Sequence, residues 1–132
     1  MLLPTIHFAG NCNEVIEFYK QKLNAEVLEI AYAKDGPAEL AAELPPSFVM
    51  FSKVKILGAL VSLTDGCENP PSAINFTYTV ICDTPEEVAE AFNALAEGGQ
   101  VTAPLRQEFW ADLTGDVTDR FGVNWNFLTL PN

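Results

Sequence analysis

Hydrophobic and polar residues alternate at the start of the chain and then change to a helical spacing. In "PTIHFA" (4–9), Ile6 and Phe8 occupy one side of an extended segment and more polar residues the other, which is typical of a half-buried strand. Further on, the apolar positions follow the period of a helix that ends near Leu23. The pattern therefore predicts a strand and then a helix near 12–23, joined by a short turn.

The rest of the chain gives similar signals for loops, turns and strands. Residues 34–47 hold three prolines and a glycine and predict a long loop with one short helical turn. Leu57-Gly58 predicts a tight hairpin, and residues 66–73 predict a linker. The other apolar stretches predict strands at 25–33, 48–56, 59–65, 74–82 and 100–110, and a turn and final strand over 119–130.

The clearest helix signal lies in "DTPEEVAEAFNALAEGG". Thr84 is suited to cap the helix, Pro85 to occupy its first turn, and Glu87 to close a capping box. The spacing predicts a helix over 85–97 that stops at the pair of glycines behind it.

Two distant stretches match each other without a gap. "FAGNCNEVIEFY" aligns with "ICDTPEEVAEAF" at a constant offset of 73, which pairs Phe8 with Ile81 and Asn11 with Thr84. Asn11 stands three residues before a glutamate, as Thr84 does, so we expect each to cap its helix. Each copy follows a strand and precedes further strands, which indicates an internal repeat of βαβββ units.

The charge balance narrows the choice of partners. Eighteen acidic residues stand against seven basic ones, a formal net charge of −11, and affinity for nucleic acids or anionic membranes depends on Lys and Arg. We therefore expect no nucleic acid and no membrane as partner. A cationic small molecule would be attracted, although acidic surfaces mainly serve solubility. The apolar runs are too short to span a bilayer, no signal peptide is evident, and three cysteines without CxxC spacing favour a reduced, cytoplasmic protein.

Three stretches carry a family resemblance: "FAGNCNEVIEFYKQKLNAEVLE", "LVSLTD" and "GGQVTAPLRQEFWADLTGDVTDRFGVNW". With the tandem units, they resemble the vicinal oxygen chelate superfamily, which includes glyoxalase I, extradiol dioxygenases and bleomycin-resistance proteins. The last stretch is similar to the ending of its PhnB-like subgroup. The resemblance implies an α+β fold in one glyoxalase-like domain (1–132), in which residues 1–66 and 74–132 form tandem βαβββ units that curl into half-barrels. It also implies a homodimer.

The metal site that the resemblance implies does not match this sequence. In the family, His and Glu side chains from the first and last strands of each unit hold the metal. This chain has one histidine, its "ALVSLT" strand has no carboxylate, and its final strand offers Asn124 and Asn126 where a Glu would stand. Since metal sites normally need three or four ligands, we expect no metal and no cofactor.

Four residues are candidates for binding a ligand. Thr5 and His7 share the more polar side of the first strand, which faces the cavity if the other side packs under the helix. Trp110 would supply an aromatic wall, with Phe51 a further candidate. We expect Trp110 and at least one of Thr5 and His7 to border one concave pocket, which a second chain could complete. In the alternative, Trp110 fills the core and His7 bonds to backbone.

Other chemistry-bearing residues have weaker signals. Cys12, at a helix N-terminus, could have a lowered thiol pKa and act as a nucleophile, but no orienting third group is evident. Four acidic residues could attract a cation or could simply lie in a solvated turn: Glu108, Asp112, Asp116 and Asp119. Of these, Asp119 suits the turn that enters the last strand.

The sequence therefore predicts a small-molecule-binding protein of the PhnB-like group without a complete metal site. One alternative is a metal-dependent lyase, isomerase or dioxygenase of the same superfamily, and another is an antibiotic-sequestering resistance protein. Metal content separates the first alternative from the others, and tight binding of a cationic glycopeptide would separate the second.

Overall fold

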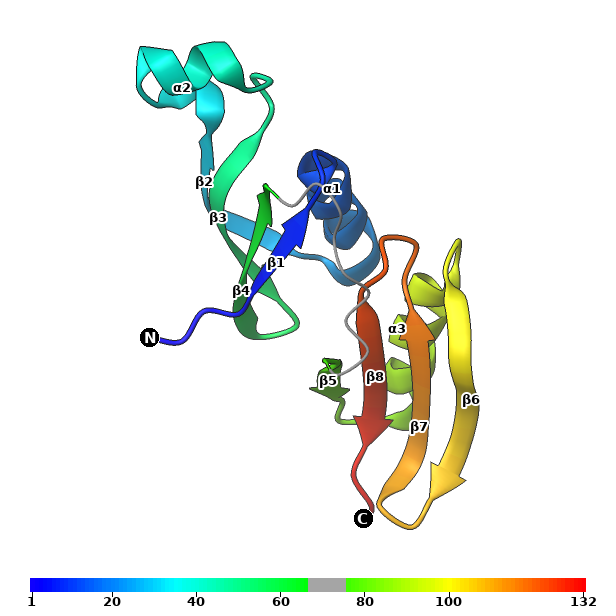
Figure 1. Ribbon diagram of the computed structural model, residues 1–132. Helices are drawn as coiled ribbons and strands as arrows, with labels where there is room; N and C mark the ends of the chain where they lie inside the picture. Colours follow the sequence, from blue (N-terminus) through cyan, green and yellow to red (C-terminus); the bar gives the residue numbers. More distant parts are fainter. Residues whose placement is uncertain (67–75) are drawn as a thin grey trace. The chain divides into compact units, whose positions relative to one another are not determined.

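Each half of the chain builds one four-stranded sheet and one twelve-residue helix (Figure 1). The computed structural model describes residues 1–66 and 76–132, and the chain divides into two units, Met1–Pro71 and Ser72–Asn132. Most of the predicted linker, with Cys67, lies outside the described residues.

The two units repeat one topology. The first consists of β1 (Thr5–Phe8), α1 (Cys12–Leu23), β2 (Glu26–Tyr32), η1 (Ala33–Asp35), α2 (Ala38–Glu43), β3 (Val49–Ile56) and β4 (Ala59–Asp65). The second consists of β5 (Tyr78–Ile81), α3 (Pro85–Ala96), β6 (Gln100–Glu108), β7 (Ala111–Thr118) and β8 (Asn124–Thr129). The sheet orders are β1-β4-β3-β2 and β5-β8-β7-β6, with the first and last strands of each unit parallel and the other neighbours antiparallel. This is the predicted α+β fold, with two open, curled sheets.

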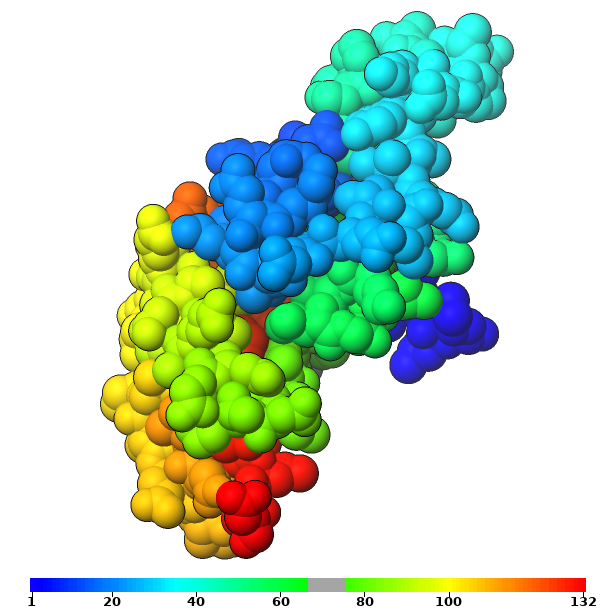
Figure 2. All heavy atoms as spheres, turned by 180° about the vertical axis from the view of Figure 1, so that it is seen from behind, coloured from blue at the N-terminus to red at the C-terminus, as the bar shows by residue number. Residues whose placement is uncertain are grey.

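In the first unit, α1 contacts β3 and β4, and one side of the sheet is buried beneath it. The apolar side chains of this core are almost completely shielded from solvent: Phe8, Val15, Ile16, Tyr19, Val54, Val61 and Leu63. Because side chains alternate along a strand, Thr5 and His7 lie on the side away from α1, as predicted. Figure 2 shows α1 in blue on the outer surface of this unit.

In the second unit, α3 packs on β7 and β8. Its buried Val88, Phe92 and Leu95 meet the side of the sheet that carries Trp125 and Phe127, whose rings are stacked with centroids 5.9 Å apart. Gly115 lies against the side chain of Phe92, since a Cβ there would be 2.7 Å from its ring. The absence of a side chain at this position therefore leaves room for Phe92 of α3 to pack on the sheet.

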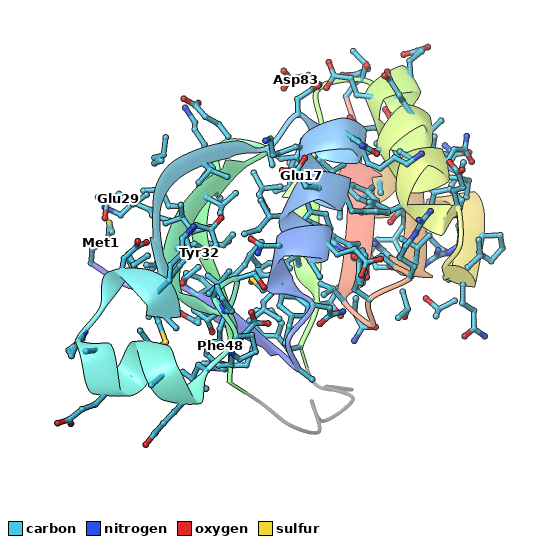
Figure 3. The ribbon with its side chains drawn as sticks, turned by 90° about the horizontal axis from the view of Figure 1, so that it is seen from above. Met1, Glu17, Glu29, Tyr32, Phe48 and Asp83 are labelled. Carbon is cyan, nitrogen blue, oxygen red and sulfur yellow. The ribbon has the colours of Figure 1, made fainter. Side chains whose placement is uncertain are left out.

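The segment between β2 and β3 is more regular than predicted. In place of a loop with one helical turn, it forms η1 and the six-residue α2, which has no buried residue and contacts η1. The N–H of Ala33 donates to the carbonyl of Phe48 at 2.9 Å. This hydrogen bond joins the two ends of the segment between β2 and β3, beside Tyr32 (Figure 3). In Figure 2, α2 (cyan) stands out from the rest of the first unit.

The two long helices begin where predicted but are capped in different ways. Thr84 Oγ1 accepts from the N–H of Glu87 at 3.2 Å, and Glu87 Oε2 accepts from the N–H of Asp83 at 3.2 Å, which confirms the capping box. The prediction for Asn11 was wrong, because its side chain makes no cap hydrogen bond. Asp65 takes that role from the end of β4, through the N–H of Cys12.

The internal repeat aligns the elements but not the faces of the first strands. Adding 73 to the bounds of β1 and α1 gives those of β5 and α3. Yet Phe8 is 3% exposed, whereas its aligned partner Ile81 is 62% exposed. A shift of one residue turns a strand over, so the pairing of Phe8 with Ile81 was wrong at the level of side chains.

Within the described part of the chain, no helix has the length and apolar character needed to cross a membrane.

Candidate functional site

The parallel strands β1 and β4 place four polar side chains on the side of the first sheet away from α1. Their register pairs Thr5 with Ser62 and His7 with Thr64. The Nδ1 atom of His7 lies 2.9 Å from the hydroxyl of Thr64, so the partner of the only histidine is a side chain and not backbone. This hydrogen bond orients the exposed imidazole and leaves its Nε2 as the nitrogen that can meet a ligand.

β3 extends this face by an aromatic ring and a lysine. Val54 pairs with Val61 on the α1 side, so alternation places Lys53 and Phe51 on the same side of the sheet as Ser62 and Thr64. We call this set the polar face: Thr5, His7, Phe51, Lys53, Ser62 and Thr64. The ring of Phe51 is 39% exposed. Three of the four predicted ligand-binding residues thus share one face of one sheet, and their role in binding stays a prediction.

The sequence reasoning missed Ser62, which lies at the centre of the polar face. The residue is 1% exposed, and its Oγ is one of two buried side-chain atoms of the described residues that lack a hydrogen-bond partner. The signal was present in "ALVSLT", because Ser62 and Thr64 alternate with buried Val61 and Leu63.

Trp110 belongs to the second unit and lies in the turn between β6 and β7. It is 44% exposed and does not fill the core of that unit. The neighbouring ring of Phe109 contacts it edge-on, with centroids 4.9 Å apart, and is itself 91% exposed. This turn presents two aromatic side chains to solvent, and the prediction that Trp110 borders a pocket with Thr5 or His7 stays a prediction.

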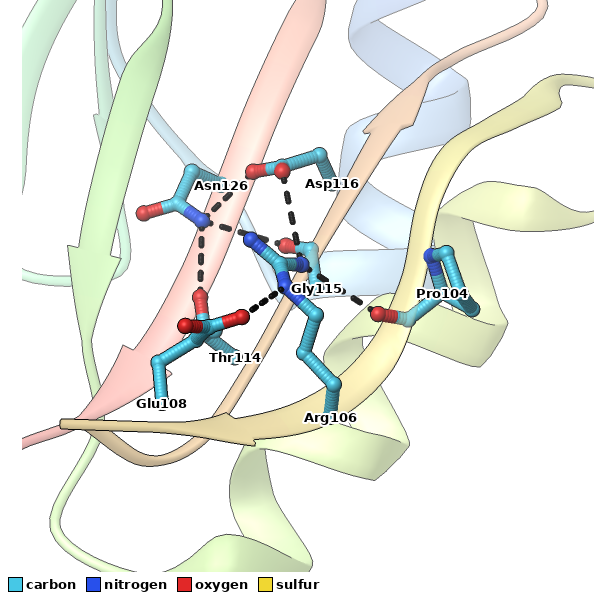
Figure 4. Close-up of polar contacts among 7 residues, drawn as sticks. All are labelled: Pro104, Arg106, Glu108, Thr114, Gly115, Asp116 and Asn126. Carbon is cyan, nitrogen blue, oxygen red and sulfur yellow. Dashed lines mark hydrogen bonds and ion pairs between the residues drawn. The ribbon is translucent and has the colours of Figure 1, made fainter.

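The second unit has a polar cluster of its own on the side of its sheet away from α3 (Figure 4). Arg106 lies between two carboxylates: its Nε donates to Glu108 Oε1 at 3.1 Å, and its Nη1 lies 3.7 Å from Asp116 Oδ2. The same Nη1 donates to the carbonyl of Pro104 at 3.3 Å. The predicted acids Glu108 and Asp116 therefore already have a cationic partner within their unit.

Asn126 completes this cluster from β8. Its Nδ2 donates to Thr114 Oγ1 at 3.0 Å, to the carbonyl of Gly115 at 3.3 Å and to Asp116 Oδ1 at 2.5 Å. An amide in this position thus binds neighbouring strands together. Because its polar groups bond to one another, the cluster stabilises the second sheet. Few of its donors and acceptors remain available to a ligand.

Asp119 has the structural role that its turn predicted. It is buried, its Oδ1 accepts from the N–H groups of Phe121 and Val123 at 2.9 and 3.1 Å, and its Oδ2 accepts from Trp125 Nε1 at 3.0 Å. A carboxylate engaged in this way fixes the entry into β8.

Cys12 does not have the properties of a reactive nucleophile, the role for which its sequence signal was weak. Its side chain is completely buried, and burial together with the nearby carboxylate of Asp65 raises the pKa of its thiol from 9.0 to about 12. Burial first, and then the negative charge of Asp65, outweigh the stabilisation that a helix N-terminus gives to a thiolate. The thiol is therefore protonated at neutral pH and shielded from reagents.

The family's metal does not fit the residues that stand in the first and last strands of each unit. β1 and β4 offer one imidazole among hydroxyl groups on the polar face, and β8 offers amides. The described residues contain no group of three or more His, Cys, Asp or Glu arranged to hold a metal ion. Neutral hydroxyls and amides are weak ligands for transition metals, so this donor set does not support metal-assisted chemistry.

Comparison with known proteins agrees with this fold. Residues 3–127 match the model of the Glyoxalase/Bleomycin resistance protein/Dioxygenase superfamily. Protein YjdN of Escherichia coli (strain K12) is 32% identical over 134 residues, which cover 94% of this chain and 91% of YjdN. The crystal structure of protein PA1353 from Pseudomonas aeruginosa is 29% identical with a TM-score of 0.83, over 100% of this chain and 98% of that one.

A more distant structure has the same fold. A PhnB protein from Bacillus cereus is 20% identical with a TM-score of 0.74, over 97% of this chain and 98% of that one. With a family model that covers both units and a relative of matching length, the chain belongs to the glyoxalase/bleomycin-resistance/dioxygenase superfamily, the vicinal oxygen chelate proteins.

Proposed function

We propose that this chain is a small-molecule-binding protein whose ligand lies on the polar face of the first unit and is held without a transition metal. The observation that carries the proposal is the hydrogen bond between His7 and Thr64, which orients an exposed imidazole on the same face as the exposed ring of Phe51.

Small-molecule sites combine apolar surface with a few polar groups of fixed direction. Phe51 supplies the apolar surface, and Thr64 fixes the direction of His7. Thr5 adds a hydroxyl whose own hydrogen bond goes to the carbonyl of Leu3 at 3.1 Å. The combination supports reversible binding, because no second acid or base accompanies His7 on its strand.

The proposal includes two further points, both of which involve aromatic residues of the second unit. Trp110 is proposed as an additional aromatic wall, and the chain is proposed to act as a homodimer. The exposed pair Phe109 and Trp110 supports the second point, because large aromatic side chains are enriched in protein interfaces. Analytical ultracentrifugation of the wild type and of a Phe109→Ser variant tests it. We expect the wild type to sediment as a dimer, and the variant dimer to have a higher dissociation constant, so that the variant is monomeric at concentrations where the wild type is still a dimer.

The binding proposal is tested by screening small aromatic compounds by thermal shift and mapping the hits by NMR on the ¹⁵N-labelled chain. We expect hits to move the amide signals of Thr5, His7 and Phe51. The variant His7→Ala should lose about tenfold in affinity, the equivalent of one hydrogen bond, and Glu17→Gln on the exposed side of α1 should bind like the wild type. Hits that map to the α1 side of the sheet, or affinity unaffected by His7→Ala, would contradict the proposal.

A further inference from the structure

We infer that the polar face recognises an anionic oxygen group on its ligand, a carboxylate or a phosphate-like group, through the hydroxyl of Ser62 and the ammonium of Lys53. The inference rests on the proposed function, because it names the chemical class that the same face would bind. It runs against the net charge of −11, which by itself favours a cationic ligand.

The first step is the unpartnered hydroxyl of Ser62. Its neighbours on this face are engaged: Thr64 with His7, and Thr5 with the carbonyl of Leu3. The Oγ of Ser62 is buried and has no partner among the residues that the structure describes. Buried polar groups are almost always hydrogen-bonded, so a hydroxyl left open in the middle of a proposed site points to a bound group that completes it.

The second step is the charge around Ser62. Lys53 lies on the same face, on the neighbouring strand β3, whereas neither β1 nor β4 places a carboxylate on this side. The acidic residue of β4, Asp65, points to the opposite side, where it caps α1. The charged group on this part of the face is therefore an ammonium, which suits a ligand group with negative charge.

Carboxylates do occur farther out on the same face, on the edge strand β2. Glu29 accepts from Lys53 Nζ at 3.2 Å, and Glu26 pairs with Lys55. Glu29 is two strands away from Ser62, roughly 10 Å by the usual strand spacing. The pair of Lys53 and Glu29 is partly exposed, and such pairs contribute little, so Lys53 can leave Glu29 for a ligand oxygen.

Ser62 is closed to solvent, so binding requires a neighbouring side chain to move. Lys53 is the neighbour with a long and flexible side chain, and its ammonium is already held only by an exposed glutamate. Movement away from Glu29 would let Lys53 bring its positive charge to a ligand on this face.

Four compounds that share one ring test the inference: benzoate, phenyl phosphate, benzyl alcohol and benzylamine. We expect one or both anions to move the amide signals of Ser62, Thr64 and Thr5, and to bind at least about tenfold more tightly than the alcohol and the amine. Benzoate and phenyl phosphate together separate a carboxylate site from a phosphate site.

Variants then assign the effect to residues. Ser62→Ala and Lys53→Met should each weaken anion binding by about fivefold to tenfold and leave benzyl alcohol unaffected. Lys20→Met is the matched control, because Lys20 forms a similar exposed pair, with Glu17 on α1, and its removal should leave anion binding unchanged. Ser62→Ala should also raise the melting temperature, since it removes a buried hydroxyl that has no partner, whereas a purely structural serine would lower it.

The outcomes separate the two proposals. Preference for benzylamine or benzyl alcohol on the polar face would overturn the anionic ligand and leave the binding face intact. Failure of all four compounds to move signals there would count against both proposals. Anion binding that is unchanged in Ser62→Ala and Lys53→Met, or that falls equally in Lys20→Met, would show a general charge effect and overturn the inference.

Discussion

Asp65 Oδ1 accepts a hydrogen bond from the backbone N–H of Cys12, at 3.0 Å and 53 residues away in the chain. The same oxygen accepts from the N–H of Gly10 at 2.9 Å, and Oδ2 accepts from the N–H of Val49 at 3.0 Å. One buried carboxylate thus caps α1 and joins the end of β4 to the start of β3. The first unit depends on this single side chain at the point where three of its elements meet.

Replacing Asp65 by alanine should therefore destabilise the chain strongly. The change leaves three backbone N–H groups without their acceptor, and we expect a loss of about 3 kcal/mol or more in the free energy of unfolding. Urea denaturation followed by circular dichroism measures this loss. Asp35→Ala, at an exposed carboxylate of η1, is the control and should change it by less than about 0.5 kcal/mol. A similar, small effect of both substitutions would show that Asp65 is not needed as a cap.

The two helix caps allow a paired experiment. Thr84→Ala removes an oxygen that accepts from the N–H of Glu87, and it should cost about 1 kcal/mol. Asn11→Ala, at the corresponding position of the other helix, should cost much less, because its side chain makes no cap hydrogen bond. Thermal melts of both variants measure the difference. Equal losses would mean that Asn11 caps α1 in solution after all.

Local sequence signals predicted most elements of the fold, and the errors came from contacts between distant residues. The capping box at Thr84 involves neighbours in sequence, so its residues could be recognised by spacing alone. The cap of α1 is supplied by Asp65, which follows a strand and gives no local sign of this role. Asn11 matched the capping pattern, yet a carboxylate from β4 already occupied the position.

The repeat and the candidate site show the same limit. The offset of 73 places the elements, but whether Phe8 or Ile81 faces a helix depends on strand pairing, which the alignment does not contain. Alternation alone put Thr5 and His7 on the correct side of β1. The alternation in "ALVSLT" could have placed Ser62 on the same face, but that its hydroxyl lacks a hydrogen-bond partner depends on contacts that no sequence pattern shows.

Gly115 offers a test of the packing in the second unit. A Cβ at this position would lie 2.7 Å from the ring of Phe92 and 3.0 Å from Leu105, so Gly115→Ala should destabilise by about 1–3 kcal/mol through overpacking. Adding Phe92→Leu should recover part of the loss, because a smaller side chain leaves room for the methyl group. A double-mutant cycle by urea denaturation measures this coupling, and strictly additive losses would contradict the close contact.

The buried thiol of Cys12 should make the chain less stable at alkaline pH. In the folded chain its pKa is raised to about 12, from an ordinary value of 9.0. Between these values the unfolded chain binds fewer protons than the folded one, so the free energy of unfolding should fall as pH rises, by about 1.4 kcal/mol per pH unit. Burial also raises the pKa values of Tyr78 and Cys82, which adds to the slope.

Comparison of the wild type with Cys12→Ala isolates this contribution. The variant loses some packing at every pH, but its stability should fall less steeply between pH 9 and 11. Urea denaturation at pH 8, 9, 10 and 11 gives both slopes. Parallel slopes would show that the thiol ionises equally well in the folded chain and is therefore not buried.

The last prediction concerns metal content. The polar face offers one imidazole among hydroxyl groups, and its Nδ1 is engaged by Thr64, so the chain should not retain a transition metal. After purification without chelator or polyhistidine tag, elemental analysis should find well below one zinc, nickel, manganese or iron per chain, and EDTA should leave the melting temperature unchanged. The control is His7→Ala, which should have the same metal content as the wild type. A stoichiometric metal that disappears in His7→Ala would contradict the proposed function and favour a metal-dependent enzyme, because His7 would then be a ligand in a site completed by residues from beyond this face.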